Sequence, residues 1–227
     1  MYTAHSLNTC THTLNFNLKA SPDGKSLGDC PFTQRANIAL KLKGVQATYI
    51  IIDLHNKPKW FLEVNPAGST PALQFGDRVI GDSHEIVQYL EKTYPNPSLN
   101  LPGNKEAEEA TGTVFSAFSE WAKNSDTSKD AELESKFTSE LEKVDKFLEK
   151  SPGAYLCDDT WSIADCVLVP RLYHLTTVAR HYKKYTKFEG MPHLMRYMET
   201  AFSSEVFKAT DYPREWILVG WAKYFQQ

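Results

Sequence analysis

The sequence is organised around one short segment, which reads Gly28-Asp29-Cys30-Pro31-Phe32-Thr33-Gln34-Arg35. Before it, apolar residues alternate over positions 14–18, which predicts a strand because side chains alternate between the two faces of a sheet. After it, Ile38, Ala39 and Leu42 recur at helical spacing. Pro31 suits the first position of a helix, where its missing N–H would have no partner. The predicted order is therefore strand, loop and helix.

Cys30 is the reactive candidate in this segment. At the N-terminus of the predicted helix it would lie among unpaired N–H groups at the positive end of the helix dipole, a setting that favours the thiolate. A lone cysteine is more commonly a small buried apolar residue, but such a residue does not need a preceding Gly28-Asp29 or a following Pro31. The carboxylate of Asp29 opposes the thiolate, a cost that a role in substrate binding would explain. Position 33 is Thr33, not a second cysteine, so a small thiol would supply the second reducing equivalent.

Length and charge narrow the class of protein. A chain of 227 residues can hold one large or two small domains. Its net charge of −3 argues against nucleic-acid binding, and no apolar run approaches the roughly 18 residues that a membrane helix needs. Residues 1–13 contain neither the apolar region of a secretory signal nor the arginines of a transit peptide. We therefore expect a cytoplasmic protein, or a chloroplast protein if a transit peptide has been removed.

The cysteines and histidines do not suggest a metal site. The four cysteines (Cys10, Cys30, Cys157 and Cys166) show no short repeated spacing, whereas a disulfide framework or a zinc site would need tighter clusters. The histidines form no H-E-x-x-H motif, and we expect His174 to be an ordinary surface or interhelix residue. We predict free thiols and no bound metal.

The composition changes at residues 95–103, where three prolines fall within nine residues and indicate a linker. We predict one domain over residues 1–94 and a second over residues 104–227. In the first domain, residues 47–54 are rich in β-branched side chains and suit a strand buried on both faces. Strand, helix and strand would then form a right-handed βαβ unit with parallel strands.

The remainder of the first domain has a ββα pattern. Residues 69–80 read as two strands joined by a tight turn. Pro71 falls at the start of a strand, where no ladder N–H is required, and a cis bond before it would let the backbone of Thr70 pair with an extended ligand. Asp82 and Glu85 have the spacing of a capping box at the start of the next helix.

The second domain shows only helical patterns. Apolar residues recur at steps of three and four over residues 114–122 and 133–148. Ser162 and Asp165 form the signature of a helix N-terminus, and two further helices are expected after it. The predicted fold class is therefore an α+β thioredoxin-like domain (βαβ-ββα) followed by an all-α domain.

These features together resemble the soluble glutathione transferase superfamily along essentially the whole chain. They are a cysteine at the start of the first helix, a proline at the third strand, Asp-Ser at the start of the next helix, and a linker to a helical half. The resemblance is closest to the plant-type dehydroascorbate reductases, and weaker to the omega-type transferases and the chloride intracellular channel proteins. Its motifs are Leu-Gly-Asp-Cys-Pro-Phe-x-Gln-Arg, Lys-Pro-x-Trp-Phe-Leu, Asp-Ser-x-x-Ile-Val and Gly-Trp-Ala.

This resemblance implies glutathione-dependent reduction of dehydroascorbate to ascorbate. Cys30 would be the nucleophile and redox centre, and Lys19 and Asp29 would bind the oxygens of dehydroascorbate or ascorbate. Two glutathione molecules would be oxidised to glutathione disulfide in ping-pong order, through a mixed disulfide on Cys30. Glutathione is thus expected as co-substrate, without a tightly bound cofactor. The resemblance also implies a monomer that does not bind nucleic acid or membranes.

The resemblance also implies five glutathione-binding positions. Lys57 would bind the glycyl carboxylate, the backbone of Thr70 beside Pro71 would pair with the cysteinyl part, and Asp82 and Ser83 would bind the γ-glutamyl amine and carboxylate. The carboxylate would lie at the positive end of a helix dipole. Taken singly, these residues would be interpreted as a surface lysine and helix caps. Only their joint occurrence with Cys30 indicates a glutathione site.

Two other functions stay open. An omega-like thioltransferase would prefer a glutathionylated peptide to dehydroascorbate. A redox-regulated protein that inserts into membranes, like the chloride intracellular channels, would float with liposomes. The first half has only one candidate for a spanning helix, and Arg35 and Lys41 interrupt it.

Overall fold

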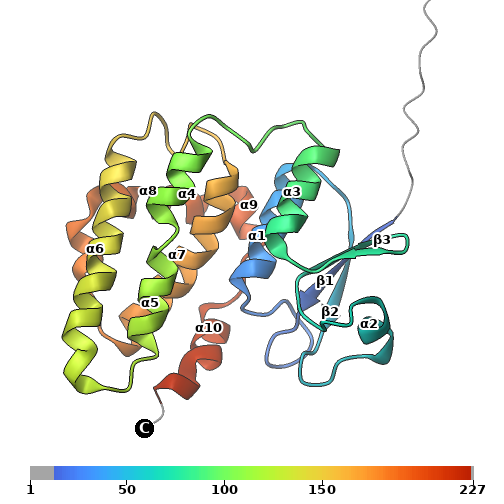
Figure 1. The fold of residues 1–227 in the computed structure, drawn as a ribbon, viewed down its shortest axis with the longest axis horizontal. Coiled ribbons are helices and arrows are strands. Elements are labelled where there is room, and N and C mark those ends of the chain that lie inside the picture. The colour runs from blue at the N-terminus through green and yellow to red at the C-terminus, as the bar shows by residue number, and fades with distance from the viewer. Residues whose placement is uncertain (1–12, 226–227) are drawn as a thin grey trace, which may run out of the picture.

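The computed structural model describes residues 13–225 and shows a small mixed sheet with helices beside a helical half (Figure 1). The fold class predicted from the sequence is confirmed. The four strands lie in the order β2-β1-β3-β4. Strand β1 pairs in parallel with β2 and antiparallel with β3, and β3 pairs antiparallel with β4. The bounds of the strands are β1 Leu14–Lys19, β2 Thr48–Ile52, β3 Ala72–Phe75 and β4 Arg78–Ile80.

The connections explain this strand order. Helix α1 (Pro31–Leu42) carries the chain from β1 to the parallel strand β2, since parallel neighbours need a long crossover. Strands β3 and β4 are joined by a two-residue turn in which Gly76 has a φ of 55°, a left-handed conformation that glycine adopts without strain. Both connections agree with the sequence prediction.

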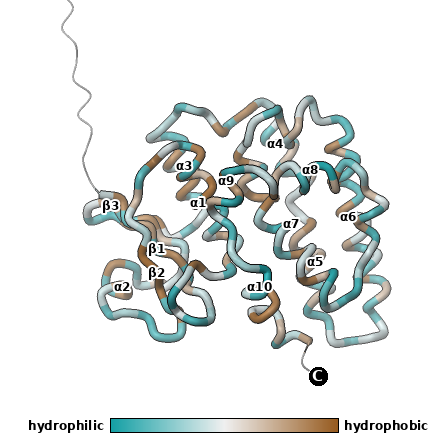
Figure 2. The backbone as a smooth tube through the Cα atoms, turned by 180° about the vertical axis from the view of Figure 1, so that it is seen from behind, coloured by the Kyte–Doolittle hydropathy of each residue, from teal (hydrophilic) through white to brown (hydrophobic). Residues whose placement is uncertain are grey.

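The prediction that residues 47–54 form a strand buried on both faces is wrong. Strand β2 lies at the edge of the sheet, and Tyr49 and Ile51 are each 38% exposed. Only Ile52 is buried within this strand. β-branched residues favour any strand, so they did not distinguish an edge from the centre of the sheet. Figure 2 shows that the tube of β2, with its three consecutive isoleucines, is nonetheless coloured as hydrophobic.

Helices cover both faces of the sheet. Helices α1 and α3 (Ser83–Thr93) lie between the sheet and the helical half, and α2 (Lys59–Val64) lies on the opposite side (Figure 1). Phe61 of α2 packs with Ile52 and Ala72 in a small separate core. Helix α3 ends at Thr93 and the next helix begins at residue 104, so we retain residues 95–103 as the proposed linker.

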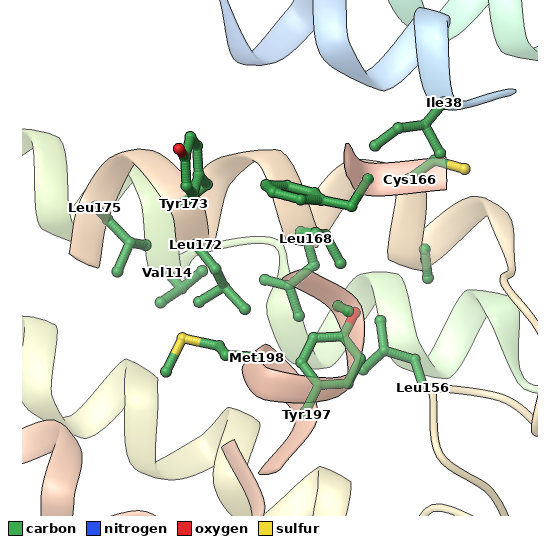
Figure 3. Packing of buried hydrophobic residues seen from close by; sticks show 14 of the residues in the cluster. Ile38, Val114, Leu156, Cys166, Leu168, Leu172, Tyr173, Leu175, Tyr197 and Met198 are labelled. Atoms are coloured by element: carbon green, nitrogen blue, oxygen red, sulfur yellow. The ribbon is translucent and has the colours of Figure 1, made fainter. Parts of the chain in front are cut away.

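The helical half is built around α7, in which fifteen of twenty residues are buried. Because α7 is buried nearly all round, the other helices pack about it. Ile38 of α1 and Cys166 of α7 belong to the same core, which spans the two halves (Figure 3). The bounds of these helices are α4 Asn104–Thr111, α5 Val114–Ala122, α6 Asp130–Glu149, α7 Ile163–Tyr182, α8 Pro192–Ser203, α9 Glu205–Lys208 and α10 Arg214–Trp221. No helix within residues 13–225 is long and apolar enough to span a membrane.

The predicted N-terminal signature of α7 forms a capping box. Ser162 Oγ accepts from the Asp165 N–H, and Asp165 Oδ2 accepts from the Ser162 N–H at 2.8 Å. The other oxygen, Oδ1, accepts from the Leu156 N–H at 3.1 Å and from the Tyr197 hydroxyl at 2.7 Å. One fully buried carboxylate therefore joins α7 to the preceding loop and to α8.

Replacing Asp165 with alanine should lower the free energy of unfolding by about 3 kcal/mol, since it removes the cap and leaves buried donors without acceptors. Urea denaturation at neutral pH measures this loss. The control is Asp126→Ala, which removes an exposed cap from a short 3₁₀ turn and should cost less than about 1 kcal/mol. Equal losses in the two variants would contradict the central role of Asp165.

Candidate active site

Cys30 caps α1, with Pro31 at the first helical position, as the sequence predicts. Its thiol is half-buried, and its Sγ accepts from the Thr33 N–H at 3.4 Å. The Cys30 carbonyl accepts the first helical hydrogen bond, from the Gln34 N–H at 2.9 Å. The sulfur thus lies against the unpaired N–H groups of a helix N-terminus, where negative charge is stabilised.

A close backbone approach holds the loop before Cys30. The Gly28 N–H donates to the Lys19 carbonyl at 2.8 Å, and the Cys30 N–H donates to the Gly28 carbonyl at 3.0 Å. A Cβ on Gly28 would lie 2.2 Å from the carbonyl oxygen of Ala20, which is backbone and cannot move aside. Glycine is therefore required at position 28, because it brings the loop back to the end of β1.

Lys19 and Asp29 form an ion pair beside Cys30, with 2.6 Å between Lys19 Nζ and Asp29 Oδ1. The Asp29 side chain is 7% exposed and that of Lys19 is 32% exposed. The pair brings together two of the residues predicted to bind substrate. It presents an acceptor and a donor side by side, which suits the hydroxyl and carbonyl oxygens of a small polar molecule.

Two cavities share this ion pair. The smaller, of about 270 Å³, is lined by Cys30, Phe32, Phe115 and Trp221 among others. The larger, of about 710 Å³, lies against the loop after β1, the loop after β2 and helix α10. Lys19 and Asp29, together with Gly220 and Lys223, line both cavities, and only the smaller one is lined by Cys30.

Arg35 holds the N-terminus of α3. Its Nε donates to Ser83 Oγ at 3.1 Å, and its Nη2 also contacts this oxygen. Burial lowers the pKa of Arg35, and the nearby carboxylate of Asp82 partly offsets this. Ser83 is 2% exposed and accepts from the guanidinium, so its hydroxyl proton remains available to a carboxylate.

The other predicted glutathione residues lie at the same end of the sheet. The Thr70-Pro71 bond is cis, and within residues 13–225 the backbone N–H and C=O of Thr70 bond to no other backbone group. Lys57 lies beside the turn that precedes Thr70. A Cβ placed on Gly68, within this turn, would be 3.0 Å from Lys57 Nζ. Asp82 caps α3 through Oδ1, which accepts from the N–H groups of His84 and Glu85.

The sequence did not predict the contribution of the helical half to this site. His174 is 2% exposed, lines the cavity of Cys30, and has its Nε2 2.9 Å from the Tyr212 hydroxyl. Burial, and then the charge of Lys19, lowers the pKa of His174 to about 3. Burial, and then the charges of Cys30 and Asp29, raises the pKa of Tyr212. Both side chains are therefore neutral near pH 7.

Helix α10 approaches Asp29 through Gly220. A Cβ on this glycine would lie 2.4 Å from Asp29 Oδ2. The sequence signal that could have predicted this approach is a glycine within an otherwise helical pattern, since such a residue commonly marks a close contact. Absence of a side chain at position 220 lets α10 close the site from the helical side.

The two other thiols within residues 13–225 lie away from the site. Cys157 and Cys166 are buried, and burial raises the pKa of each thiol. Cys10 lies outside the described residues. No group of three or more histidine, cysteine or acidic residues that could hold a metal ion occurs in the described part of the chain.

Comparison with known proteins identifies the family. Residues 29–93 match the family "Glutathione S-transferase, N-terminal domain", and residues 114–205 match "Glutathione S-transferase, C-terminal domain". The chain belongs to the glutathione S-transferase family. The resemblance inferred from the sequence motifs is thus confirmed, and the two matches fall on the two halves of the fold.

Similar members of the glutathione S-transferase family include plant proteins. The chain is 36% identical to "Probable glutathione S-transferase DHAR1, cytosolic" of Oryza sativa subsp. japonica, over 87% of this chain and 91% of that protein. It is 33% identical to "Glutathione S-transferase DHAR3, chloroplastic" of Arabidopsis thaliana, over 94% and 81% of the two chains. The crystal structure of Chlamydomonas reinhardtii dehydroascorbate reductase superposes with a TM-score of 0.83 at 27% identity, covering 93% of this chain and 98% of that chain.

Gly220→Ala should destabilise this glutathione S-transferase by about 1–3 kcal/mol, because the new methyl group overlaps the Asp29 carboxylate. A Gly→Ala change inside a helix ordinarily stabilises by about 1 kcal/mol, so the sign of the effect is diagnostic. Thermal unfolding measures it. The control is Gly190→Ala, where a Cβ would meet no atom within 4 Å. A stabilised Gly220→Ala protein would contradict the close approach of α10.

His174 should make stability fall in mild acid. The unfolded state takes up a proton near pH 6.5, whereas the buried His174 stays neutral down to about pH 3, so stability present at pH 7 is lost as the pH falls. Between pH 7 and 4.5 the wild type should lose about 2 kcal/mol more than His174→Gln. Tyr212→Phe keeps the buried imidazole and should keep the wild-type slope. Parallel pH profiles for wild type and His174→Gln would refute this.

Proposed function

We propose that this protein reduces dehydroascorbate to ascorbate and oxidises two glutathione molecules to glutathione disulfide through Cys30. The observation that carries the proposal is a thiol at a helix N-terminus that shares its cavity with the Lys19–Asp29 ion pair. The named relatives support it, since they include a dehydroascorbate reductase. Within residues 13–225, neither of the other two thiols lines this cavity, which supports an external thiol as the group that completes the cycle.

The first step reduces the substrate. Lys19 donates to one oxygen of dehydroascorbate and Asp29 accepts from a hydroxyl, which holds the dicarbonyl group beside the Cys30 thiolate. The Cys30 sulfur supplies both electrons, and one water molecule supplies the oxygen of the sulfenic acid and the proton that the product gains, so ascorbate leaves as its anion and Cys30 becomes a sulfenic acid. The positive end of the α1 dipole favours the anionic sulfur in this step.

The next two steps restore the thiolate. One glutathione condenses with the sulfenic acid, releasing the water taken up before and forming a mixed disulfide with Cys30. A second glutathione attacks the glutathione sulfur of that disulfide, which releases glutathione disulfide and the Cys30 thiolate. The sum is one dehydroascorbate and two glutathione converted to ascorbate and glutathione disulfide.

The first glutathione binds along the start of β3 and the start of α3. The free backbone groups of Thr70, beside Pro71, pair with its cysteinyl part as an added strand would. The Ser83 hydroxyl, held by Arg35, donates to the γ-glutamyl carboxylate at the helix N-terminus. Asp82 faces the γ-glutamyl amine. Lys57 binds the glycyl carboxylate.

We further propose that the protein acts as a monomer without a tightly bound cofactor. We retain the cytoplasm as its compartment and the chloroplast as the alternative, since its relatives carry both locations in their names.

Replacing Cys30 with serine should lower dehydroascorbate reduction at least about 100-fold, because a hydroxyl forms neither the sulfenic acid nor the mixed disulfide. Ascorbate formation in the presence of glutathione measures the rate. The matched control is Cys157→Ser, a buried thiol outside the cavity, which should keep more than about half of the rate.

Two results would count against the proposal. One is substantial activity in Cys30→Ser. The other is a wild-type protein that reduces a glutathionylated peptide faster than dehydroascorbate, which would favour the thioltransferase alternative.

A further inference from the structure

The cavity that contains Cys30 carries excess positive charge. Its walls include Lys19, Lys123 and Lys223 but only one carboxylate, that of Asp29. Asp29 already pairs with Lys19, and His174 is neutral because its pKa is lowered to about 3. Two ammonium groups therefore remain for an anion, and neither forms an ion pair with any residue in the described range 13–225.

Aromatic rings hold these lysines in place. Lys123 follows the last residue of α5, and its Nζ lies 5.6 Å from the centre of the Trp221 ring and 5.3 Å from that of Tyr224. Lys223 Nζ lies 5.1 Å from the centre of the Tyr224 ring. Cation–π contacts restrict both side chains but leave their N–H groups able to donate. The result is an aromatic-walled site with positive charge, adjacent to the reactive sulfur.

The position of Lys123 indicates which reactant it meets. The proposed site of the first glutathione is built by the sheet half, from residues 57–83. Lys123 belongs to the helical half, and the two halves contribute different walls of the cavity. A thiol that reaches the Cys30 mixed disulfide from the helical side would therefore pass Lys123.

We propose that Lys123, assisted by Lys223, binds a carboxylate of the second thiol, the one that resolves the mixed disulfide on Cys30. This rests on the proposed function and adds to it a substrate class for the last step: a thiol with a carboxylate, in preference to a neutral or cationic thiol. The ion pair raises the local concentration of the thiol and directs its sulfur to the disulfide.

The step balances without a further reactant. The second thiol loses its proton to solvent, and its sulfur forms a bond to the glutathione sulfur of the mixed disulfide. The bond between that sulfur and Cys30 Sγ breaks, and its electron pair stays on Cys30 as the thiolate. Lys123 touches only the carboxylate, so its effect depends on the charge of the thiol and not on the chemistry of the sulfur.

The test isolates this last step. The wild-type protein is first converted to the Cys30 mixed disulfide with glutathione disulfide, and mass spectrometry verifies one glutathione per chain. The protein is then mixed rapidly with glutathione or with glutathione diethyl ester, in which both carboxylates are blocked, and release of the bound glutathione is timed. The same is done with Lys123→Met, Lys123→Arg and a control, Lys208→Met, which removes an exposed lysine outside the cavity.

Lys123→Met should react with glutathione about five-fold more slowly than wild type, as expected for loss of one partly exposed ion pair. Its reaction with the diethyl ester should not slow. Lys123→Arg, which keeps the charge and the contact with the rings, should recover most of the rate with glutathione, and Lys208→Met should match wild type.

A Lys123→Met protein that slows equally with both thiols, or with neither, overturns the assignment. Equal slowing would indicate that Lys123 only supports the position of Trp221 and Tyr224. The reaction with the thiols contains no dehydroascorbate, so the two proposals can fail separately. A protein that prefers glutathione to its diethyl ester but does not reduce dehydroascorbate would support the role of Lys123 and refute the proposed function. A wild type that forms no mixed disulfide on Cys30 would overturn both.

Discussion

The burial of helix α1 between the sheet and α7 is the constraint on which the rest of this structure depends. Eight consecutive residues of α1, from Thr33 to Leu40, are buried, so the helix contacts protein on all sides. This burial includes polar groups, which are costly to remove from water unless they are paired. Hydrogen bonds offset this cost for two of them: Arg35 donates to Ser83, and Asn37 accepts from the Tyr49 hydroxyl. A helix held in this way has little freedom to move, and the sulfur at its first turn shares that restriction.

The electrostatics of the site follow from this placement. The N–H groups of the first turn face Cys30, while Asp29, one residue earlier, brings a carboxylate that would oppose the thiolate. Lys19 lies 2.6 Å from that carboxylate and offsets its charge, and α10 covers it from the other side through Gly220. The protein thus keeps an acidic group beside the proposed nucleophile at reduced electrostatic cost, where the proposed function uses it to accept a hydrogen bond from a substrate hydroxyl.

The two halves contribute different parts of the site. The sheet half supplies the sulfur, the ion pair and the start of β3, where the backbone of Thr70, unpaired within the described residues, suits a peptide ligand. The helical half supplies His174, Gly220 and the rings that surround Lys123. Because α1 packs against α7 in a core shared by both halves, these groups converge on one cavity although more than ninety residues separate Cys30 from Lys123. On the proposed function, two thiols can therefore approach the same sulfur from two sides.

The elements and their local chemistry could be predicted from the sequence alone, because the signals for them act over a few residues. Pro31 after Cys30 places the thiol at a helix N-terminus, Gly76 permits the hairpin, and Ser162 with Asp165 starts α7. That β2 is an edge strand became clear only from the folded chain, since β-branched residues suit both the edge and the centre of a sheet. It alone also brought His174, Gly220 and Lys123 to Cys30. Their role depends on how α5, α7 and α10 pack against α1, and that packing arises from contacts between residues far apart in the chain, which no local pattern encodes.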